Sequence, residues 1–105
     1  MSVTYRLFQR WTAKKKIPSA AEGCAALGLE RQAATYWKSG RNAEAHIIER
    51  MAIDLGEEPA GYILAANAEK VRNSDERTTL LRTAKRLGYA ALLFLVPTVG
   101  TLSIM

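Results

Sequence analysis

The 105-residue sequence predicts an all-α protein with five helices in one small domain, a further helix, and an apolar C-terminal tail. Apolar residues recur every three or four positions in each segment up to Leu87, which is the period of helices packed through one face. Residue types that begin and end helices stand between these segments. No segment before Ala90 alternates apolar and polar residues as a half-buried strand does. We therefore expect a helical domain over 1–72, a basic connecting helix over 73–86 and a tail over 87–105.

The first helix is expected over residues 4–16, with Leu7, Phe8 and Trp11 on one face. It should end there because Pro18 disfavours the helical conformation of the residue before it.

The second helix is expected to begin at Ser19, because the segment 19–22 has the S-x-x-E pattern of a capping box. It should end at Gly28, which can adopt a positive φ. A short third helix is expected over 30–39 and should end at Gly40.

Three more helices follow. Asn42 is a good N-cap for the fourth, which should end at Gly56. Pro59 fits the first turn of a fifth helix that runs to about Arg72. Ser74 is expected to cap the sixth.

The tail over 87–105 has 19 residues without a charged side chain, just long enough for a transmembrane helix. In that interpretation, the basic residues before it place the domain at the cytoplasmic face of the inner membrane. The alternative is a strand or helix that packs on the domain or on a second chain. The basic residues before the tail are Arg77, Arg82, Lys85 and Arg86.

Positive charge is concentrated in the first 41 residues. This segment holds eight basic and two acidic residues, whereas residues 42–105 are nearly neutral within a total net charge of +5. Such a balance favours an anionic partner, either nucleic acid or a lipid surface. The single cysteine, Cys24, cannot form an intramolecular disulfide, and the N-terminus has no signal-peptide pattern, so the sequence predicts a cytoplasmic location.

The segment around Gly28 has the pattern of a helix-turn-helix. This motif needs a small residue in the first helix, a turn residue that accepts a left-handed conformation, and apolar residues that pack the second helix down. The residues at those spacings are Cys24, Leu27, Gly28, Leu29, Ala34 and Trp37.

The remaining residues of the second helix are polar and suit contacts with duplex DNA. Arg31 can bind guanine and Gln32 can bind adenine through two hydrogen bonds each. Thr35 and Tyr36 come one turn later and suit a thymine methyl or a phosphate. The residues expected to contact phosphates are Lys14, Lys15, Lys16, Lys38 and Arg41.

The segment "AALGLERQAATYWKSGR" resembles the helix-turn-helix of phage and prophage Cro and lambda-repressor-like proteins. The resemblance extends over about residues 4–72 and includes the Gly-x-x-Pro turn at 56–59. It implies a five-helix domain that binds double-stranded DNA and regulates transcription, as a homodimer because one recognition helix reads only a half-site. The matching residues are Ala26, Leu27, Gly28, Arg31, Gln32, Trp37 and Gly40.

The sequence leaves a second hypothesis open. Glu30 stands where the family usually has a Ser or Thr helix cap, and its carboxylate would face phosphates. The protein could therefore be a phage-encoded interaction protein that binds a host or phage protein, at the inner membrane if the tail inserts. No acid–base pair beside a nucleophile, phosphate-binding glycine loop or metal-ligand spacing occurs, so the sequence predicts neither an enzyme nor a cofactor.

Overall fold

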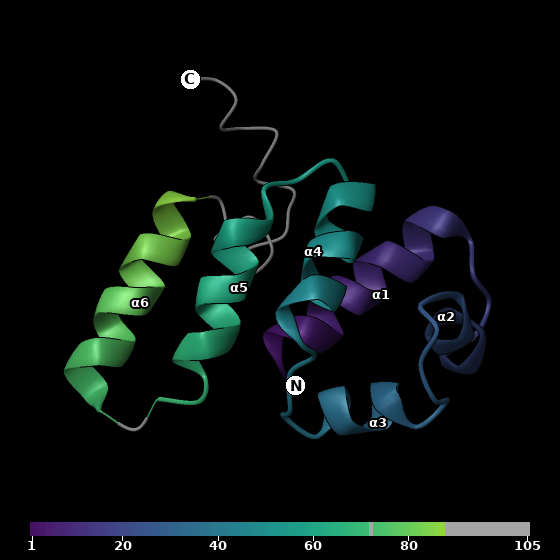
Figure 1. The fold of residues 1–105 in the computed structure, drawn as a ribbon, viewed down its shortest axis with the longest axis horizontal. Helices are drawn as coiled ribbons and strands as arrows, with labels where there is room; N and C mark the ends of the chain where they lie inside the picture. The colour runs from purple at the N-terminus through teal and green to yellow at the C-terminus, as the bar shows by residue number, and fades with distance from the viewer. Residues whose placement is uncertain (72, 88–105) are drawn as a thin grey trace.

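The computed structural model describes residues 1–71 and 73–87, and these form helices joined by short loops (Figure 1). No strand occurs among them, which confirms the all-α fold. In Figure 1, α5 and α6 lie side by side, while α2 and α3 lie at the other side of the molecule. The helices are α1 (Val3–Lys15), α2 (Ala20–Ala26), α3 (Ala33–Lys38), α4 (Ala45–Asp54), α5 (Pro59–Ala68) and α6 (Ser74–Arg86).

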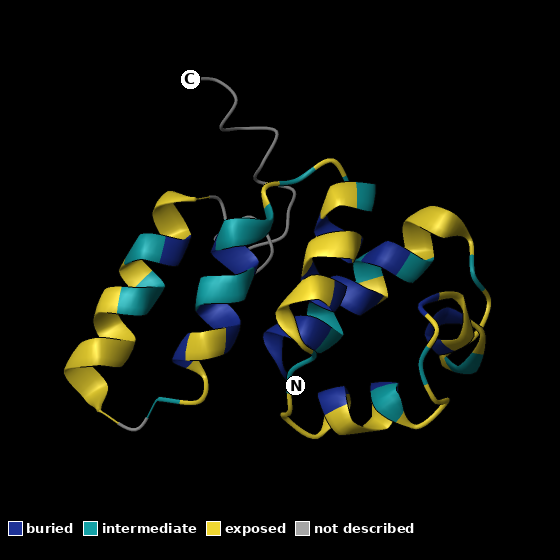
Figure 2. Cartoon of the chain, viewed as in Figure 1, coloured by how far each residue is buried: buried dark blue, intermediate teal, exposed yellow. Residues whose placement is uncertain are grey.

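The hydrophobic core lies where α1 meets α3, α4 and α5, and the buried residues in Figure 2 follow the inward faces of these helices. Phe8 is the centre of an aromatic cluster. Its ring stacks on Trp11 at 6.1 Å and meets the edge of Trp37 at 5.2 Å. These pairs join α3 to α1 by contacts of the type that stabilise aromatic cores.

Two helix starts were predicted correctly. The Ser19 hydroxyl caps α2 by accepting a hydrogen bond from the Glu22 N–H, as a capping box requires. Pro59 is the first residue of α5. The predicted start of the sixth helix was one residue late, because Asn73 rather than Ser74 caps α6 by accepting from the N–H of Glu76.

Asn42 does not cap α4, which was a wrong prediction. Its Oδ1 instead accepts from the N–H and the hydroxyl of Thr4, at 3.0 and 2.7 Å. Its Nδ2 donates to Glu69 Oε1 at 2.7 Å, and the same oxygen accepts from the Val3 N–H at 3.1 Å. Tertiary partners therefore occupy Asn42, and α4 begins after Glu44, which makes no side-chain cap. These bonds join the start of α1 to the α3–α4 loop and to the end of α5.

The first four helices end in the same way, in a Schellman motif. In each, the residue in the left-handed region donates its N–H to a carbonyl three residues earlier, and the next N–H bonds a carbonyl five residues earlier. Glycines occupy this position after α2, α3 and α4, as predicted. After α1 it is Lys16, with φ 58°. The longer bonds are Ile17 to Thr12, Leu29 to Cys24, Arg41 to Tyr36 and Glu57 to Ala52.

The helix predicted at 73–86 is present and packs on α5. The close approach depends on Gly61, where an added Cβ would lie 3.1 Å from the Ala84 carbonyl oxygen and 3.2 Å from that of Leu87. Helix α5 ends at Ala68, four residues before the predicted end near residue 72.

Of the tail predicted at 87–105, only Leu87 belongs to the described residues, so both interpretations of that segment lie outside them. Within residues 1–71 and 73–87, none of the helices combines the length and the apolar character needed to cross a membrane.

Candidate nucleic-acid interface

Helices α2 and α3 are joined by a tight turn at Gly28. Its φ of 76° lies in the left-handed region, and nothing lies within 4 Å of the position its Cβ would take, so backbone conformation alone favours glycine here. Leu27 before it is buried and Leu29 after it is half-buried, as the predicted motif requires.

The close approach between α2 and α1 occurs at Gly23, which was not predicted from the sequence. A Cβ at Gly23 would lie 2.7 Å from Phe8 Cζ and 2.9 Å from Thr12 Cγ2. Cys24, the small residue predicted inside this helix, is fully buried beside it in the sequence. A glycine inside a helical pattern often has a packing reason, and that signal could have identified Gly23.

Helix α3 begins at Ala33, so its predicted start at Glu30 was wrong. The Ala33 N–H bonds the Glu30 carbonyl at 3.0 Å and closes a single turn before the helix. The residue before α3, Gln32, makes no side-chain cap. Arg31 and Gln32 therefore lie in the turn that leads into α3 rather than in its first helical turn.

Residues 31–38 divide into a buried and an exposed face. Ala34 and Trp37 are each 4% exposed, which confirms that they face the core. The backbone N–H of Ser2 donates to the Trp37 carbonyl at 3.2 Å and attaches the end of α3 to the start of α1. The residues proposed from the sequence for base and phosphate contacts in this segment are all exposed: Arg31, Gln32, Thr35, Tyr36 and Lys38.

Tyr36 contacts two other polar side chains at this face. The Arg41 guanidinium carbon lies 5.4 Å from the centre of the Tyr36 ring, within the range of a cation–π contact. The Tyr36 hydroxyl donates to Gln32 Oε1 in a long hydrogen bond of 3.4 Å. Gln32 is the N-cap residue, and the Tyr36 N–H bonds its carbonyl at 3.3 Å, so Tyr36 follows it one helical turn later. These contacts were not predicted from the sequence, because they depend on side-chain orientation.

The lysines at the end of α1 are partly engaged elsewhere. Lys15 Nζ lies 3.4 Å from Asp54 Oδ2 and 5.7 Å from the centre of the Trp11 ring. Lys14 donates to the Asp54 carbonyl at 3.3 Å. Lys16 is exposed in the left-handed turn. This end of α1 is the one farther from α3 (Figure 1), so the structure does not bring the three lysines together with the exposed face of α3.

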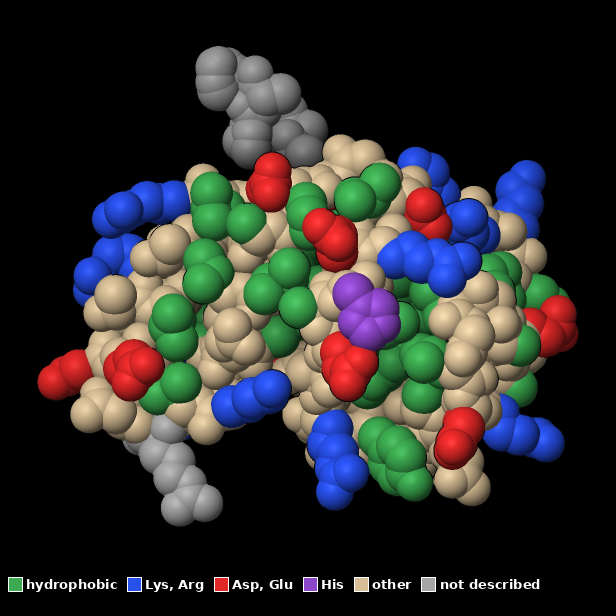
Figure 3. All heavy atoms as spheres, viewed as in Figure 1, with side chains coloured by type: hydrophobic (Ala, Val, Ile, Leu, Met, Phe, Trp, Pro, Cys, Tyr) green, Lys and Arg blue, Asp and Glu red, His purple; other side chains and the backbone are tan. Residues whose placement is uncertain are grey.

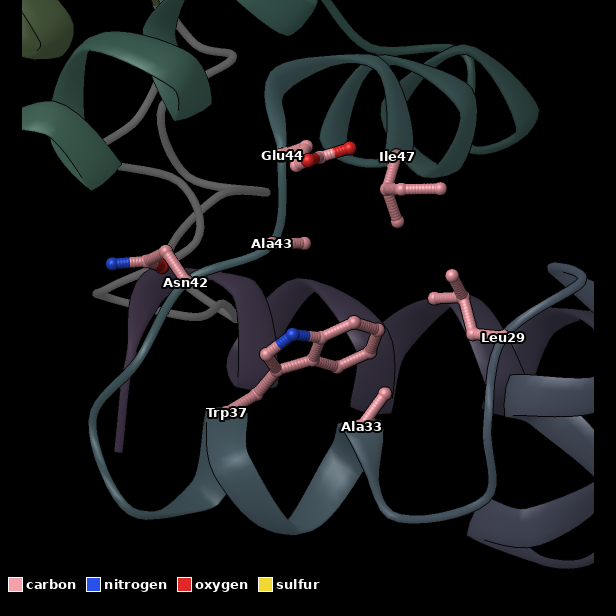
Figure 4. A pocket seen from close by; sticks show the side chains of 7 residues that line it. All are labelled: Leu29, Ala33, Trp37, Asn42, Ala43, Glu44 and Ile47. Carbon is pink, nitrogen blue, oxygen red and sulfur yellow. The ribbon is translucent and has the colours of Figure 1, made fainter.

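A shallow groove separates α3 from the start of α4 (Figure 4). Its volume is about 330 Å³. Ile47 of α4 lies across the groove from Ala33 and Trp37. Helix α3 is attached to the domain mainly through its contacts with α1 and α2. The lining residues are Leu29, Ala33, Trp37, Asn42, Ala43, Glu44 and Ile47.

A polar network joins α1 to the start of α5. Arg10 donates to Glu57 Oε1 at 2.9 Å, pairs with its Oε2, and donates to the Tyr62 hydroxyl at 3.0 Å. Burial raises the pKa of Tyr62 to about 12, assisted by its hydrogen bond to Glu57. Burial alone would raise the pKa of Glu57, but hydrogen bonds from Arg10 and Tyr62 outweigh it and lower that pKa. The network favours the charged carboxylate and stabilises the scaffold rather than the exposed face of α3.

A second shifted group lies at the end of α4. The Trp11 indole donates to Asp54 Oδ2 at 2.9 Å and lowers the pKa of that carboxyl, and Lys15 lowers it further against the opposing effect of burial. Asp54 therefore joins α4 to α1 as a carboxylate.

Charge and metal ligands are distributed as follows. Figure 3 shows Lys and Arg side chains around the outline of the viewed face, including the lower edge where α3 lies, with acidic groups between them. Within the described part of the chain, no three His, Cys, Asp or Glu side chains are grouped closely enough to hold a metal ion. The interface thus offers charge, hydrogen bonds and one aromatic ring to a ligand.

Comparisons with known proteins found no relationship for this chain: no family model, no curated protein and no solved structure matches it.

Proposed function

We propose that the protein is a sequence-specific double-stranded DNA-binding regulator of a phage or prophage, with the turn at 30–32 and helix α3 in the major groove. The observation that carries the proposal is the division of this segment into two faces. Ala34 and Trp37 attach α3 to the core, whereas the arginine and glutamine of the preceding turn and the threonine and tyrosine of α3 remain exposed. This combination suits the reading of base edges, because the anchoring and reading residues are separate.

The described geometry supports a helix-turn-helix in its details. A left-handed glycine connects α2 to α3, a glycine of α2 permits close approach to α1, and Trp37 seats α3 on Phe8. Arg31 and Gln32 lie where α3 begins, and residues at that end of a recognition helix reach base edges. Lys38 at the other end suits a phosphate, which contributes affinity.

A homodimer is part of this proposal, because a single recognition helix of this kind reads only a half-site. Sedimentation of the protein with a two-half-site duplex should give two chains per duplex. One chain per duplex at saturation would contradict this part.

The test measures binding of the full-length protein to the upstream region of its own gene by fluorescence anisotropy. Because residues 88–105 carry no charge, all samples contain the same mild non-ionic detergent. We expect affinity to fall steeply with salt and to exceed that for random duplex by about 10³-fold or more. Arg31→Ala/Gln32→Ala should lower affinity for the specific site at least about 10-fold.

A matched control removes the same two side-chain types elsewhere. Gln9 on α1 and Arg82 on α6 are exposed, so Gln9→Ala/Arg82→Ala should leave the preference for the specific site unchanged. Weak binding to every sequence, equal in both double variants, would overturn the proposal.

One observation favours a second function, binding of a host or phage protein through the same face. Glu30 is exposed beside Arg31, and its carboxylate suits a protein surface better than phosphates. In that case, binding would depend on Arg31 and Gln32 but would be insensitive to added duplex DNA.

A further inference from the structure

We propose that Arg41 is a positioning residue: through the ring of Tyr36 it holds Gln32 ready to read an adenine, rather than binding a phosphate. The inference rests on the proposed function and assigns a specificity device to the same face of α3.

The first step is the end of α3, which determines where Arg41 lies. Gly40 has a φ of 121°, which L side chains rarely adopt. The Gly40 N–H bonds the Trp37 carbonyl at 3.2 Å, and the Arg41 N–H bonds the Tyr36 carbonyl at 3.0 Å. In this motif the residue after the glycine returns to the residue five positions earlier, where an apolar contact commonly forms. Here the contact is that of a guanidinium with an aromatic ring.

The second step is the Tyr36 ring. Tyr36 is 46% exposed. Burial alone therefore does not hold its side chain in one rotamer. The Arg41 guanidinium covers the ring at 5.4 Å. A planar guanidinium stacks on such a face, whereas a lysine ammonium offers only a point charge. Arg41 thus restricts the orientation of Tyr36.

The third step is Gln32. The Tyr36 hydroxyl donates to the amide oxygen of Gln32, Oε1, and leaves this oxygen one further lone pair. The amide nitrogen keeps both of its protons for other acceptors. Adenine needs this pair of groups, an acceptor for its N6 amino group and a donor to its N7. The side chain is oriented before DNA arrives, so less conformational entropy is lost on binding.

Two conservative variants isolate the two contacts. Tyr36→Phe removes the hydroxyl but keeps the ring beneath Arg41. Arg41→Lys keeps the positive charge but loses the planar group. A long side chain that is already oriented before binding raises affinity by about 2- to 10-fold. We therefore expect both variants to lose about 2- to 10-fold of the discrimination at one A·T base pair of the preferred site, with non-specific affinity and salt dependence unchanged.

The experiment uses the full-length protein and a duplex series in which each A·T pair of the preferred site is replaced in turn. NMR of the free protein is recorded in parallel. The side-chain amide resonances of Gln32 should shift in Tyr36→Phe, and the guanidinium resonances of Arg41 should lose their ring-current shift in Tyr36→Ala. Thr78→Val, at an exposed position of α6, serves as a control for a change away from this face.

The outcomes separate this inference from the proposed function. If Arg41 binds a phosphate, Arg41→Lys keeps the full discrimination, and Arg41→Ala weakens binding to all sequences and reduces the salt slope by about 1. That result, or unchanged NMR spectra, overturns the inference while specific DNA binding stands. No specific binding by the unaltered protein overturns both.

Discussion

Asn42 accepts hydrogen bonds from both the backbone N–H and the hydroxyl of Thr4, although 38 residues separate them. Thr4 is fully buried, so neither its N–H nor its hydroxyl can form a hydrogen bond with water when Asn42 is lost. The Thr4 hydroxyl in turn accepts from the N–H of Ala43. These bonds satisfy both polar groups of Thr4 in the first turn of α1 and attach the α3–α4 loop to that turn.

Replacing this side chain should destabilise the whole domain. Asn42→Ala leaves the buried N–H of Thr4 without its acceptor, which costs about 1–3 kcal/mol. Urea unfolding followed by circular dichroism measures the loss. Asn67 is exposed on α5, and Asn67→Ala should change stability by no more than about 0.5 kcal/mol. Equal effects of the two substitutions would mean that the Thr4 contacts contribute nothing.

Gly23 should tolerate no larger side chain. Alanine favours a helix interior by about 1 kcal/mol over glycine. Its Cβ would meet the Phe8 ring at 2.7 Å, and overpacking of a tight contact costs about 1–3 kcal/mol. We expect Gly23→Ala to lower the melting temperature and to weaken DNA binding by displacing α2. Ala25→Gly, at an exposed position of the same helix, measures the propensity effect alone. A stabilised Gly23→Ala would disprove the close contact.

Lys16 offers a stabilising substitution. It adopts φ 58° after α1, in a position that glycine occupies after α2, α3 and α4. The left-handed conformation costs an L residue roughly 1–2 kcal/mol, so Lys16→Gly should raise the free energy of unfolding by about 1 kcal/mol. Lys16→Ala removes the same charge without relieving the backbone, and the two variants should therefore differ. Identical stabilities would show that the conformation carries no strain.

Stability should fall in acid because of Glu57. Its pKa in the folded protein lies below the ordinary value of 4.5. A carboxyl of this kind stabilises the fold above its unfolded pKa, and this contribution is lost as pH falls through the folded pKa. Glu57→Gln should cost about 1–2 kcal/mol at neutral pH and give a shallower fall below about pH 4.5. Unfolding at a series of pH values measures both effects.

The control for this pH dependence is Glu49→Gln, at an exposed position of α4. It should reproduce the acid profile of the unaltered protein. If Glu57→Gln gave the same profile as Glu49→Gln, the Arg10–Glu57–Tyr62 network would not be the source of the acid sensitivity.

Features that depend on neighbouring residues were predictable from the sequence. The Ser19 cap, the proline start of α5 and the glycine ends of three helices are determined within a few residues. Features that depend on distant partners were not. Asn42 looks like a helix cap until Thr4 and Glu69 are brought beside it, and Lys14 and Lys15 look free until Asp54 lies near them.

The candidate site follows the same division. The inward positions of Ala34 and Trp37 follow from spacing, and the structure has them buried. The start of α3 was misplaced, because a turn closed by Glu30 and Ala33 has the same polar sequence as a first helical turn. The contact of Arg41 with the Tyr36 ring depends on the backbone direction after Gly40, which composition does not reveal.

The shared ending of the first four helices has a consequence for how the chain folds. Each ending closes hydrogen bonds between groups no more than five residues apart, as between Tyr36 and Arg41. Contacts of short sequence separation lose little loop-closure entropy, and helical proteins rich in them fold in about microseconds to milliseconds. We expect the reversals of chain direction to form early, and the bonds among Thr4, Asn42 and Glu69 to form only when the two ends of the domain meet. The rate of folding would then depend on the helix ends. Resistance to unfolding would depend on the late-formed hydrogen bonds among Thr4, Asn42 and Glu69.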